Sequence, residues 1–334
     1  MTDRTLPLFP EKIPQAFAHL IENADAQTAA VLKREIVYSE LENTVEPYEH
    51  VDPLGEHKHA VQPYMIHQYR NRLLVLTTGQ CVGHCRYCFR REFTARQLPF
   101  LTDEQVKFLA HYLSERPEIS EVLLSGGDPL TGSYEKLKHL IHAIRAAAPD
   151  VVIRICTRAI VFAPALFTHK LLDLFVSAKP LWIIPHINHR GELGNAQVQA
   201  IHRCIDAGLA LQSQTVLLRG VNDTVAALSD LFNYLVRLSV KPGYLFQLDT
   251  ARGTSHFAVP FDESIALWQK LQPLLTGLSR PEFAVDLLDG AGKFSLSAVA
   301  AHKSITHIDK YGFTVQKDDG TQAQYTRERE PAPV

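Results

Sequence analysis

Short apolar runs alternate with amphipathic stretches through the middle of the chain. The apolar runs are Arg72–Thr77, Glu121–Leu124, Val151–Ile155, Leu181–Pro185, Leu209–Leu218 and Tyr244–Leu248. Their centres lie roughly 30 to 50 residues apart, which is the length of a β-strand followed by a helix. Short runs that are apolar on both faces are typical of parallel strands covered by helices. The pattern therefore predicts six parallel strands in an α/β fold.

Apolar residues with helical spacing follow these runs. Thr102 and Gln105 form a predicted capping box, and the helical pattern after them ends at Pro117. The other predicted helices are Ser133–Ala148, Ala163–Ser177, Asn195–Ala207, Thr224–Leu238 and Asp262–Leu275. Six βα units in a row predict a partial (βα)6 barrel, and a doubly wound sheet is the alternative that periodicity leaves open. In a barrel, chemistry is expected where strands end and βα loops begin.

The two ends of the chain follow other patterns. Pro14–Asn23 and Gln27–Ser39 are predicted amphipathic helices, while Tyr311–Val315 and Gln322–Thr326 alternate around the hairpin signal Asp319-Gly320. We therefore divide the chain into an N-terminal helical extension (1–60), a partial barrel (61–275) and a C-terminal segment with a β-hairpin and a mobile tail (276–334).

Composition and charge exclude several classes of protein. The 334 residues are 46% hydrophobic, which is enough to fill a core, so a disordered chain is not expected. The 34 basic and 36 acidic residues leave a net charge of −2, so no basic excess points to nucleic acid. No window approaches roughly 18 uninterrupted apolar residues, and no secretory signal opens the chain. We therefore expect neither a nucleic-acid partner nor a membrane span.

Three of the five cysteines fall within eight residues, directly after the first apolar run. Thiolates spaced as in Cys81-Val-Gly-His-Cys85-Arg-Tyr-Cys88 suit zinc, copper(I) or an iron–sulfur cluster. A structural zinc site needs four ligands, and only His84, between two of the cysteines, is a nearby fourth candidate. Three thiolates would leave one iron of a four-iron cluster open to a ligand from outside the protein. Buried structural cysteines are the remaining alternative.

The CxxxCxxC spacing after the first strand resembles the signature of radical S-adenosylmethionine (SAM) enzymes. This resemblance implies a [4Fe-4S] cluster on Cys81, Cys85 and Cys88, whose open iron chelates SAM. One electron then cleaves SAM to a 5′-deoxyadenosyl radical. A cluster of this kind requires reducing conditions, so we expect a cytoplasmic protein and an electron donor of the flavodoxin or ferredoxin type.

Two further strand ends carry polar motifs. Within the resemblance, the segment Ser125, Gly126, Gly127 and Asp128 matches the glycine-rich stretch that holds the amino group of SAM, and His186 and Gln214 match residues that contact SAM. Taken alone, paired glycines also suit a tight turn, and a buried histidine is commonly a hydrogen-bonded core residue.

A lysine follows closely spaced glycines near the C-terminus. In Gly290-Ala-Gly292-Lys293, Phe294 replaces the Ser or Thr that a phosphate-binding P-loop requires after its lysine. A lysine packed in such a loop can instead form a Schiff base, as pyridoxal phosphate (PLP) enzymes require. A solvated lysine on a turn is the alternative.

Several motifs in one order narrow the resemblance. They are DPLGE, HQYRNR, CRYCFRREF, LLSGGDP, HINH, QTVLLRGVND and the glycine–lysine segment. Together they resemble the PLP-dependent lysine 2,3-aminomutase family. The resemblance implies that Lys293 is catalytic and holds PLP as an internal aldimine, that Arg72 and Tyr69 lie near the PLP phosphate, that Arg90 pairs with the substrate carboxylate, and that Asp249 and Asp286 bind the substrate side-chain ammonium.

The implied activity is the transfer of the 2-amino group of L-lysine to C3, which gives β-lysine. The alternatives are the aminomutase that supplies β-lysine for an elongation factor, a 2,3-aminomutase for arginine or ornithine, and a non-enzymatic iron–sulfur electron carrier or zinc-binding module. No cysteine follows Cys204, and Thr224 stands where longer relatives carry a zinc ligand, so no zinc is expected. Gln68 stands where the family has an arginine. A homo-oligomer is compatible with the resemblance.

Overall fold

The computed structural model describes residues 9–308, 312–316 and 320–326. Asp319 of the predicted hairpin turn and the tail at 327–334, which we expected to be mobile, lie outside these residues. No helix in the described ranges is long and apolar enough to cross a membrane.

Seven parallel strands form the centre of a ten-stranded sheet. They are β3 (Arg72–Leu76), β4 (Glu121–Ser125), β5 (Val152–Thr157), β6 (Leu181–Pro185), β7 (Ala210–Val216), β8 (Lys241–Phe246) and β9 (Glu282–Leu287). The strands follow one another in chain order, whereas a doubly wound sheet reverses its order at a switch point. The structure is therefore the predicted partial barrel of the α/β class, and all six predicted strands are confirmed.

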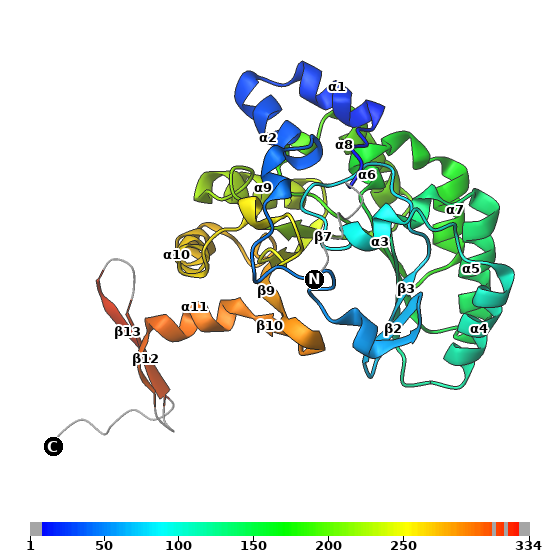
Figure 1. Ribbon diagram of the computed structural model, residues 1–334. Helices are drawn as coiled ribbons and strands as arrows, with labels where there is room; N and C mark the ends of the chain where they lie inside the picture. The colour runs from blue at the N-terminus through cyan, green and yellow to red at the C-terminus, as the bar shows by residue number, and fades with distance from the viewer. Residues whose placement is uncertain (1–8, 309–311, 317–319, 327–334) are drawn as a thin grey trace.

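Six helices connect the parallel strands and cover the outside of the sheet (Figure 1). They are α4 (Asp103–Ser114), α5 (Tyr134–Ala147), α7 (His169–Ser177), α8 (Asn195–Asp206), α9 (Val225–Arg237) and α10 (Phe261–Leu271). The capping box of Thr102 and Gln105 is confirmed. Two of these six helices are shorter than predicted, and α2 (Ala26–Ile36) of the N-terminal extension ends at Ile36 rather than at the predicted Ser39. A short turn at Pro164 precedes α7, which begins after the cap Thr168, and α10 gives way to a 3₁₀ turn at Gln272.

The strands are less apolar on their inner face than the sequence pattern suggested. In β5, Ile153 and Ile155 are fully buried against the helices, while Arg154 and Cys156 line an internal cavity. Side chains alternate between the two faces of a strand, so each strand can supply both the core and the cavity. The barrel interior is therefore partly polar.

Antiparallel strands extend both edges of the sheet. β1 (Ala60–Gln62) and β2 (Met65–Tyr69) precede β3, and β10 (Gly292–Ser295) pairs with β9. The 3₁₀ turn Leu288–Gly290 joins β9 to β10, which places Lys293 directly opposite Asp286. The seventh parallel strand, β9, was not predicted.

The N-terminal extension packs over one end of the barrel. Its helices are α1 (Gln15–Asn23) and α2 (Ala26–Ile36), and α1 also contacts the short helix α6 (Ala159–Phe162) that follows β5. Asp25 caps α2 by accepting from the Gln27 and Thr28 backbone N–H groups. Another short helix, α3 (Arg91–Ala95), follows the cysteine motif.

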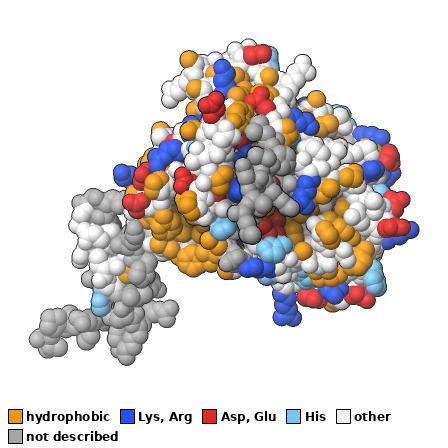
Figure 2. Space-filling model, in the orientation of Figure 1, with side chains coloured by type: hydrophobic (Ala, Val, Ile, Leu, Met, Phe, Trp, Pro, Cys, Tyr) orange, Lys and Arg blue, Asp and Glu red, His pale blue; other side chains and the backbone are white. Residues whose placement is uncertain are grey.

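The last helix, α11 (Leu296–Ser304), packs against α10 and β9. The strands after it project from the body of the molecule (Figure 1). They are β11 (Ile305–Ile308), β12 (Gly312–Gln316) and β13 (Gln322–Thr326). β12 and β13 pair as the predicted hairpin. On the face in Figure 2, charges of both signs are interspersed, which agrees with the small net charge. The division at residues 60 and 275 stays a proposal, and the barrel sheet continues through β9 and β10.

Candidate active site

One cavity of about 320 Å³ lies inside the barrel, and all fifteen site residues predicted from the sequence line it. They are Cys81, Cys85, Cys88, Ser125, Gly126, Gly127, Asp128, His186, Gln214, Tyr69, Arg72, Arg90, Asp249, Asp286 and Lys293. Residues separated by more than 200 positions thus meet because consecutive parallel strands place their ends around a common interior. The volume is in the range of small-molecule sites.

The glycine-rich segment after β4 lies against the start of the cysteine loop. The Gly127 N–H donates to the Thr78 carbonyl oxygen and the Asp128 N–H donates to that of Gln80, each at 2.7 Å. A Cβ atom on Gly127 would lie 2.1 Å from the Gln80 oxygen, and Gly126 has a φ of +117°. These glycines are therefore required by the close approach of two backbones, whatever ligand they also contact.

Asp128 connects the ends of two strands. Its buried carboxylate accepts from the Leu130 N–H, the Thr157 hydroxyl and the Arg158 N–H, at 2.8 to 3.0 Å. Because these donors occupy both oxygens, Asp128 positions the loops after β4 and β5. Its contact with SAM stays a prediction.

The three cysteines of the motif are partly buried at the edge of the cavity. Burial raises the pKa of each thiol, that of Cys88 to about 11, and neighbouring thiols raise those of Cys81 and Cys88 further. A positively charged metal centre would offset the cost of three neighbouring thiolates. Within the described part of the chain, no three Cys, His, Asp or Glu side chains converge on a single metal ion. Three cysteines at the edge of one cavity can each bind a different iron of a cluster.

His84 has a structural environment. Its ring stacks on Phe9 with a centroid separation of 4.8 Å, and its Nδ1 lies 2.7 Å from the Pro10 carbonyl oxygen. His84 is buried and does not line the cavity. It therefore offers no fourth ligand beside the three cysteines.

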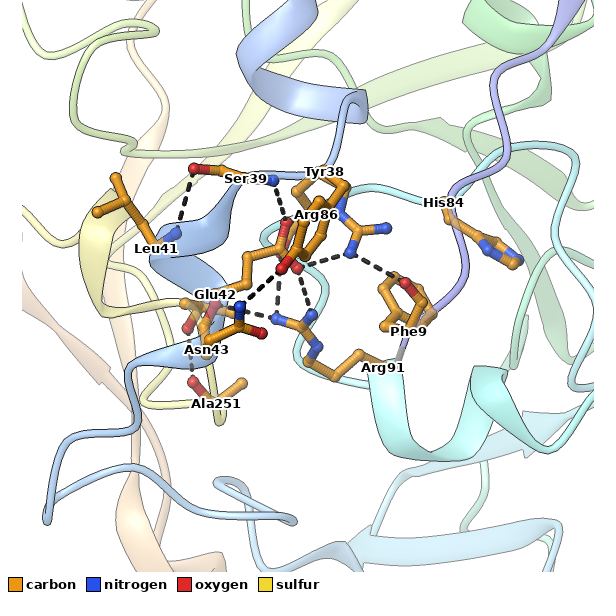
Figure 3. Close-up of polar contacts among 12 residues, drawn as sticks. Phe9, Tyr38, Ser39, Leu41, Glu42, Asn43, His84, Arg86, Arg91 and Ala251 are labelled. Carbon is orange, nitrogen blue, oxygen red and sulfur yellow. Dashed lines mark hydrogen bonds and ion pairs between the residues drawn. The ribbon is translucent and has the colours of Figure 1, made fainter. Parts of the chain in front are cut away.

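The N-terminal extension holds the cysteine loop through a buried carboxylate (Figure 3). Glu42 accepts from Arg86 Nε and Nη2 at 2.8 and 2.6 Å, and from Arg91 Nη2 at 2.6 Å. Arg86 lies between Cys85 and Cys88, and its guanidinium also donates to the Phe9 and Pro10 carbonyl oxygens. One carboxylate with two charge-assisted partners therefore fixes the loop on both sides of its last cysteine.

A second buried network was missed by the sequence analysis. Arg158, which follows β5, donates to Cys85 Sγ at 2.8 Å and to Glu35 Oε2 at 2.7 Å. Glu192 accepts from the same guanidinium. One sequence signal could have found this network: Glu35 lies on the buried face of α2 between Leu32 and Ile36, where a charge requires a partner.

His186 and Gln214 lie side by side where β6 and β7 end, and they form an isolated parallel bridge. The His186 Nε2 atom lies 3.1 Å from the Tyr87 hydroxyl and 3.0 Å from Asn188 Oδ1. Burial lowers the pKa of His186 to about 3, and the nearby Arg158 lowers it further. His186 is thus a neutral imidazole at physiological pH.

Lys293 enters the cavity from β10. Its Nζ atom donates to both Asp286 oxygens at 2.9 Å and lies 4.0 Å from the Phe246 ring centroid. The Lys293 backbone N–H donates to the Tyr69 hydroxyl at 2.8 Å, and the Arg72 guanidinium lies over the Tyr69 ring. An amine beside an arginine and aromatic rings fits an aldehyde cofactor that carries a phosphate.

Asp249 follows β8 and belongs to the same group of charges. Burial raises its pKa to about 8, and the neighbouring Asp286 carboxylate adds to the increase, while Lys293 opposes it. A second cation beside the two carboxyl groups would favour the ionised form of Asp249, so the pair suits an additional ammonium group.

Arg90, two residues after Cys88, lines the cavity and pairs with Glu56 of the DPLGE motif. Its buried Nε atom has no hydrogen-bond partner among the described residues. A donor left free at the cavity can donate to a ligand carboxylate. Gln68 donates to the Gly290 carbonyl oxygen at 3.0 Å, so it supports the turn before Lys293.

This chain is similar to known proteins. The Radical SAM superfamily model matches residues 75–231. A putative L-lysine 2,3-aminomutase of Treponema pallidum is 48% identical over 94% of this chain and 89% of its own length. The L-lysine 2,3-aminomutase of Escherichia coli is 33% identical over 84% of this chain and 81% of its own length. That of Clostridium subterminale is 35% identical over 72% of this chain and 58% of its own length. A radical SAM methyltransferase structure from Sphaerobacter thermophilus aligns with a TM-score of 0.47 and 17% identity over 66% of this chain and 68% of that one. The chain belongs to the lysine 2,3-aminomutase family of radical SAM enzymes and is an isomerase.

Proposed function

We propose that this enzyme moves the 2-amino group of L-lysine to C3 and releases β-lysine. The observation that carries the proposal is the meeting, in one cavity, of three cysteines, a lysine amine and two carboxylates. Membership of an enzyme family removes the non-enzymatic alternatives, an electron carrier or a zinc-binding module. The radical SAM family implies a [4Fe-4S] cluster and SAM, and PLP is part of the proposal.

The charges of the cavity support a basic amino acid as substrate. Arg90 offers its free Nε atom to the α-carboxylate, while Asp249 and Asp286 offer carboxylates to the side-chain ammonium. The Asp286 carboxylate accepts from the Lys293 amine. Lys293 would hold the aldehyde cofactor through this amine, which would leave Asp286 available to the ammonium of the substrate.

Apolar residues complete the lining and exclude water from the reacting atoms. They include Leu54, Leu123, Ile184, Phe246 and Leu248. The bound groups supply one-electron cleavage of SAM and an electron sink for the migrating nitrogen. Cys81, Cys85 and Cys88 would hold the cluster, and Lys293, Tyr69 and Arg72 would hold PLP.

The test is anaerobic incubation of the reconstituted enzyme with SAM, dithionite and, separately, lysine, arginine, ornithine and glutamate. We expect β-lysine from lysine, resolved from lysine by chromatography and mass spectrometry. A flavodoxin or ferredoxin replaces dithionite in a parallel reaction as the proposed physiological donor. The matched control is Cys88→Ala, which removes one proposed cluster ligand and should form no product.

Two outcomes would contradict the proposal in different ways. If none of the four amino acids gives a β-amino acid while the cluster is loaded and cleaves SAM, the aminomutase activity is refuted. If glutamate reacts and lysine does not, the assignment of Asp249 and Asp286 to a substrate ammonium is refuted.

A further inference from the structure

The Arg158 side chain contacts groups from three distant parts of the chain. Its Nη1 atom donates to Cys85 Sγ at 2.8 Å and to the Tyr87 hydroxyl. Its Nη2 atom donates to Glu35 Oε2 at 2.7 Å and Glu192 Oε2 at 3.1 Å. Only 7% of the side chain is exposed. The guanidinium therefore lies between a cysteine sulfur on one side and two carboxylates on the other.

Several contacts prevent the guanidinium from moving away from the sulfur. Its carbon centre lies 4.5 Å from the centroid of the Phe162 ring, and its backbone N–H is held by Asp128. Glu35 also accepts from the Asn188 side chain at 2.9 Å, so the carboxylate that anchors Arg158 is itself fixed. A planar guanidinium with fixed partners keeps its donor direction, which a flexible lysine would not do.

A hydrogen bond to a ligand sulfur changes the redox properties of an iron–sulfur cluster. Reduction adds negative charge to the cluster and its thiolates, and an N–H donor that carries positive charge stabilises this added charge. The two carboxylates contact the far nitrogen of the guanidinium, so the positive group is the one nearest to the sulfur.

We propose that Arg158 is a positioning residue that raises the reduction potential of the cluster through its hydrogen bond to Cys85, and that Glu35 of the N-terminal extension holds it there. The proposal rests on the cluster that the radical SAM family implies, and it does not depend on which amino acid the enzyme uses. It assigns to α2 a role in the redox chemistry of a site that is more than 40 residues away in sequence.

The test is a redox titration of the anaerobically reconstituted full-length enzyme without substrate, followed by the electron paramagnetic resonance signal of the reduced cluster. One electron passes from dithionite to the cluster in each variant. In Arg158→Gln we expect the ratio of reduced to oxidised cluster at a fixed poise to fall by about tenfold, which corresponds to about 59 mV toward negative potential for one electron. Arg158→Lys keeps the charge without the planar donor and should shift in the same direction by less.

Arg154→Gln is the matched control. Arg154 lies on β5, which Arg158 follows, lines the same cavity and pairs with Glu121, but no hydrogen bond joins it to a cysteine of the motif in the described structure. Its removal takes away the same charge and should shift the potential much less. Equal shifts in Arg154→Gln and Arg158→Gln would show a general charge effect and overturn the proposal, as would an unchanged potential in Arg158→Gln.

Glu35→Gln tests whether Glu35 holds Arg158 in place. It also replaces Arg158→Gln as the test variant if that protein binds no iron. It keeps Arg158 but removes its strongest carboxylate contact, so a smaller shift toward negative potential is expected. An unchanged potential in this variant would overturn the role of α2. Wild-type protein that loads no cluster would instead contradict the cofactor assignment, whereas a failed aminomutase assay with normal potentials would contradict only the proposed function.

Discussion

The cysteine loop and the lysine strand face the same cavity, yet they hold their charges in different ways. Around the loop, the side chains of Arg86, Arg91 and Arg158 are between 1% and 9% exposed, and each contacts a buried carboxylate. At the other end, Lys293 and Asp286 keep 25% and 18% of their side chains exposed and form a single cross-strand pair.

This difference matches the needs of the two ends. A buried pair leaves a costly unpaired charge when it breaks, so it holds one arrangement. A partly exposed pair loses little when it exchanges partners, because water screens the charges. Cluster ligands require fixed geometry, whereas a substrate has to replace partners already present. The ion pairs around the proposed cluster are therefore fixed, whereas the ion pair at the proposed substrate site can exchange its partners.

The largest expected effect is at the partly exposed pair of Lys293 and Asp286, which we call the exchangeable end. Lys293→Ala removes the amine proposed to bind PLP, so activity should fall on the order of 10³-fold or more, with loss of any PLP absorbance band that borohydride reduces. Stability should change little, because the pair with Asp286 is partly exposed. Activity assays and thermal unfolding measure both. Lys170→Ala, which changes an exposed lysine outside the cavity, is the control. Full activity in Lys293→Ala would remove the central residue of the proposal.

The second effect tests the buried ion pairs that Glu42 forms around the cysteine loop. Glu42→Ala leaves Arg86 and Arg91 buried without their carboxylate, so the free energy of unfolding should fall by about 3–5 kcal/mol. Denaturant unfolding gives this value, and iron analysis shows whether the loop still binds a cluster. Glu263→Gln is the matched control, because Glu263 pairs with Arg219 at the surface and its loss should remain below about 1 kcal/mol. Equal losses in both variants would end the distinction between the two regions.

The third effect concerns the backbone contact between Gly127 and Gln80, at the start of the cysteine loop. Gly127→Ala places a Cβ atom 2.1 Å from the Gln80 oxygen, so the loop has to shift, with a loss of about 1–3 kcal/mol in the free energy of unfolding. Gly277→Ala meets no atom within 4 Å in the described structure and should be nearly neutral. Urea unfolding of the two variants gives the comparison. A neutral Gly127→Ala would mean that the two loops are not held closely together.

The smallest effect is a pH dependence at the exchangeable end. The raised pKa of Asp249, about 8, means that the carboxyl is largely protonated below this pH. Asp286, Lys293, Arg90 and Glu56 are the charged groups near it. Ionised Asp249 should bind an ammonium better, so the dissociation constant for lysine should fall by up to about tenfold per pH unit as the pH rises toward 8, while the lysine side chain stays charged to about 10.4.

Equilibrium binding between pH 6 and 9 measures this slope. In Asp249→Asn the slope should disappear, because the side chain no longer titrates. A slope that persists in Asp249→Asn would assign the titration to another group.

Local patterns were sufficient for much of the fold. Six strands, the capping box at Thr102 and the C-terminal hairpin were predicted because each depends on residues close in sequence. β9 was missed because it contains Glu282 and Asp286 and so is not a continuous apolar run. The turn at Pro164 and the end of α10 were missed because apolar spacing continues across both.

The candidate site was likewise predictable only where it depends on residues close in sequence. The cysteine spacing and the glycines before Lys293 are local motifs, and their resemblance to a known family led directly to the cavity. The groups that hold the cysteine loop are not local. Arg158 and Glu35 are 123 residues apart, and Arg86 and Glu42 are 44 apart, so no spacing rule connects them.

The sequence by itself determined which chemistry this protein carries, because thiols, a lysine amine and paired carboxylates are properties of residue type and local order. Only the tertiary structure decided how these groups are held. Burial and partners from distant segments set the pKa of Asp249, bring Arg158 to a cysteine sulfur and place Glu42 between two arginines. These quantities depend on distance and solvent exposure, which arise when the sheet and the N-terminal extension pack together.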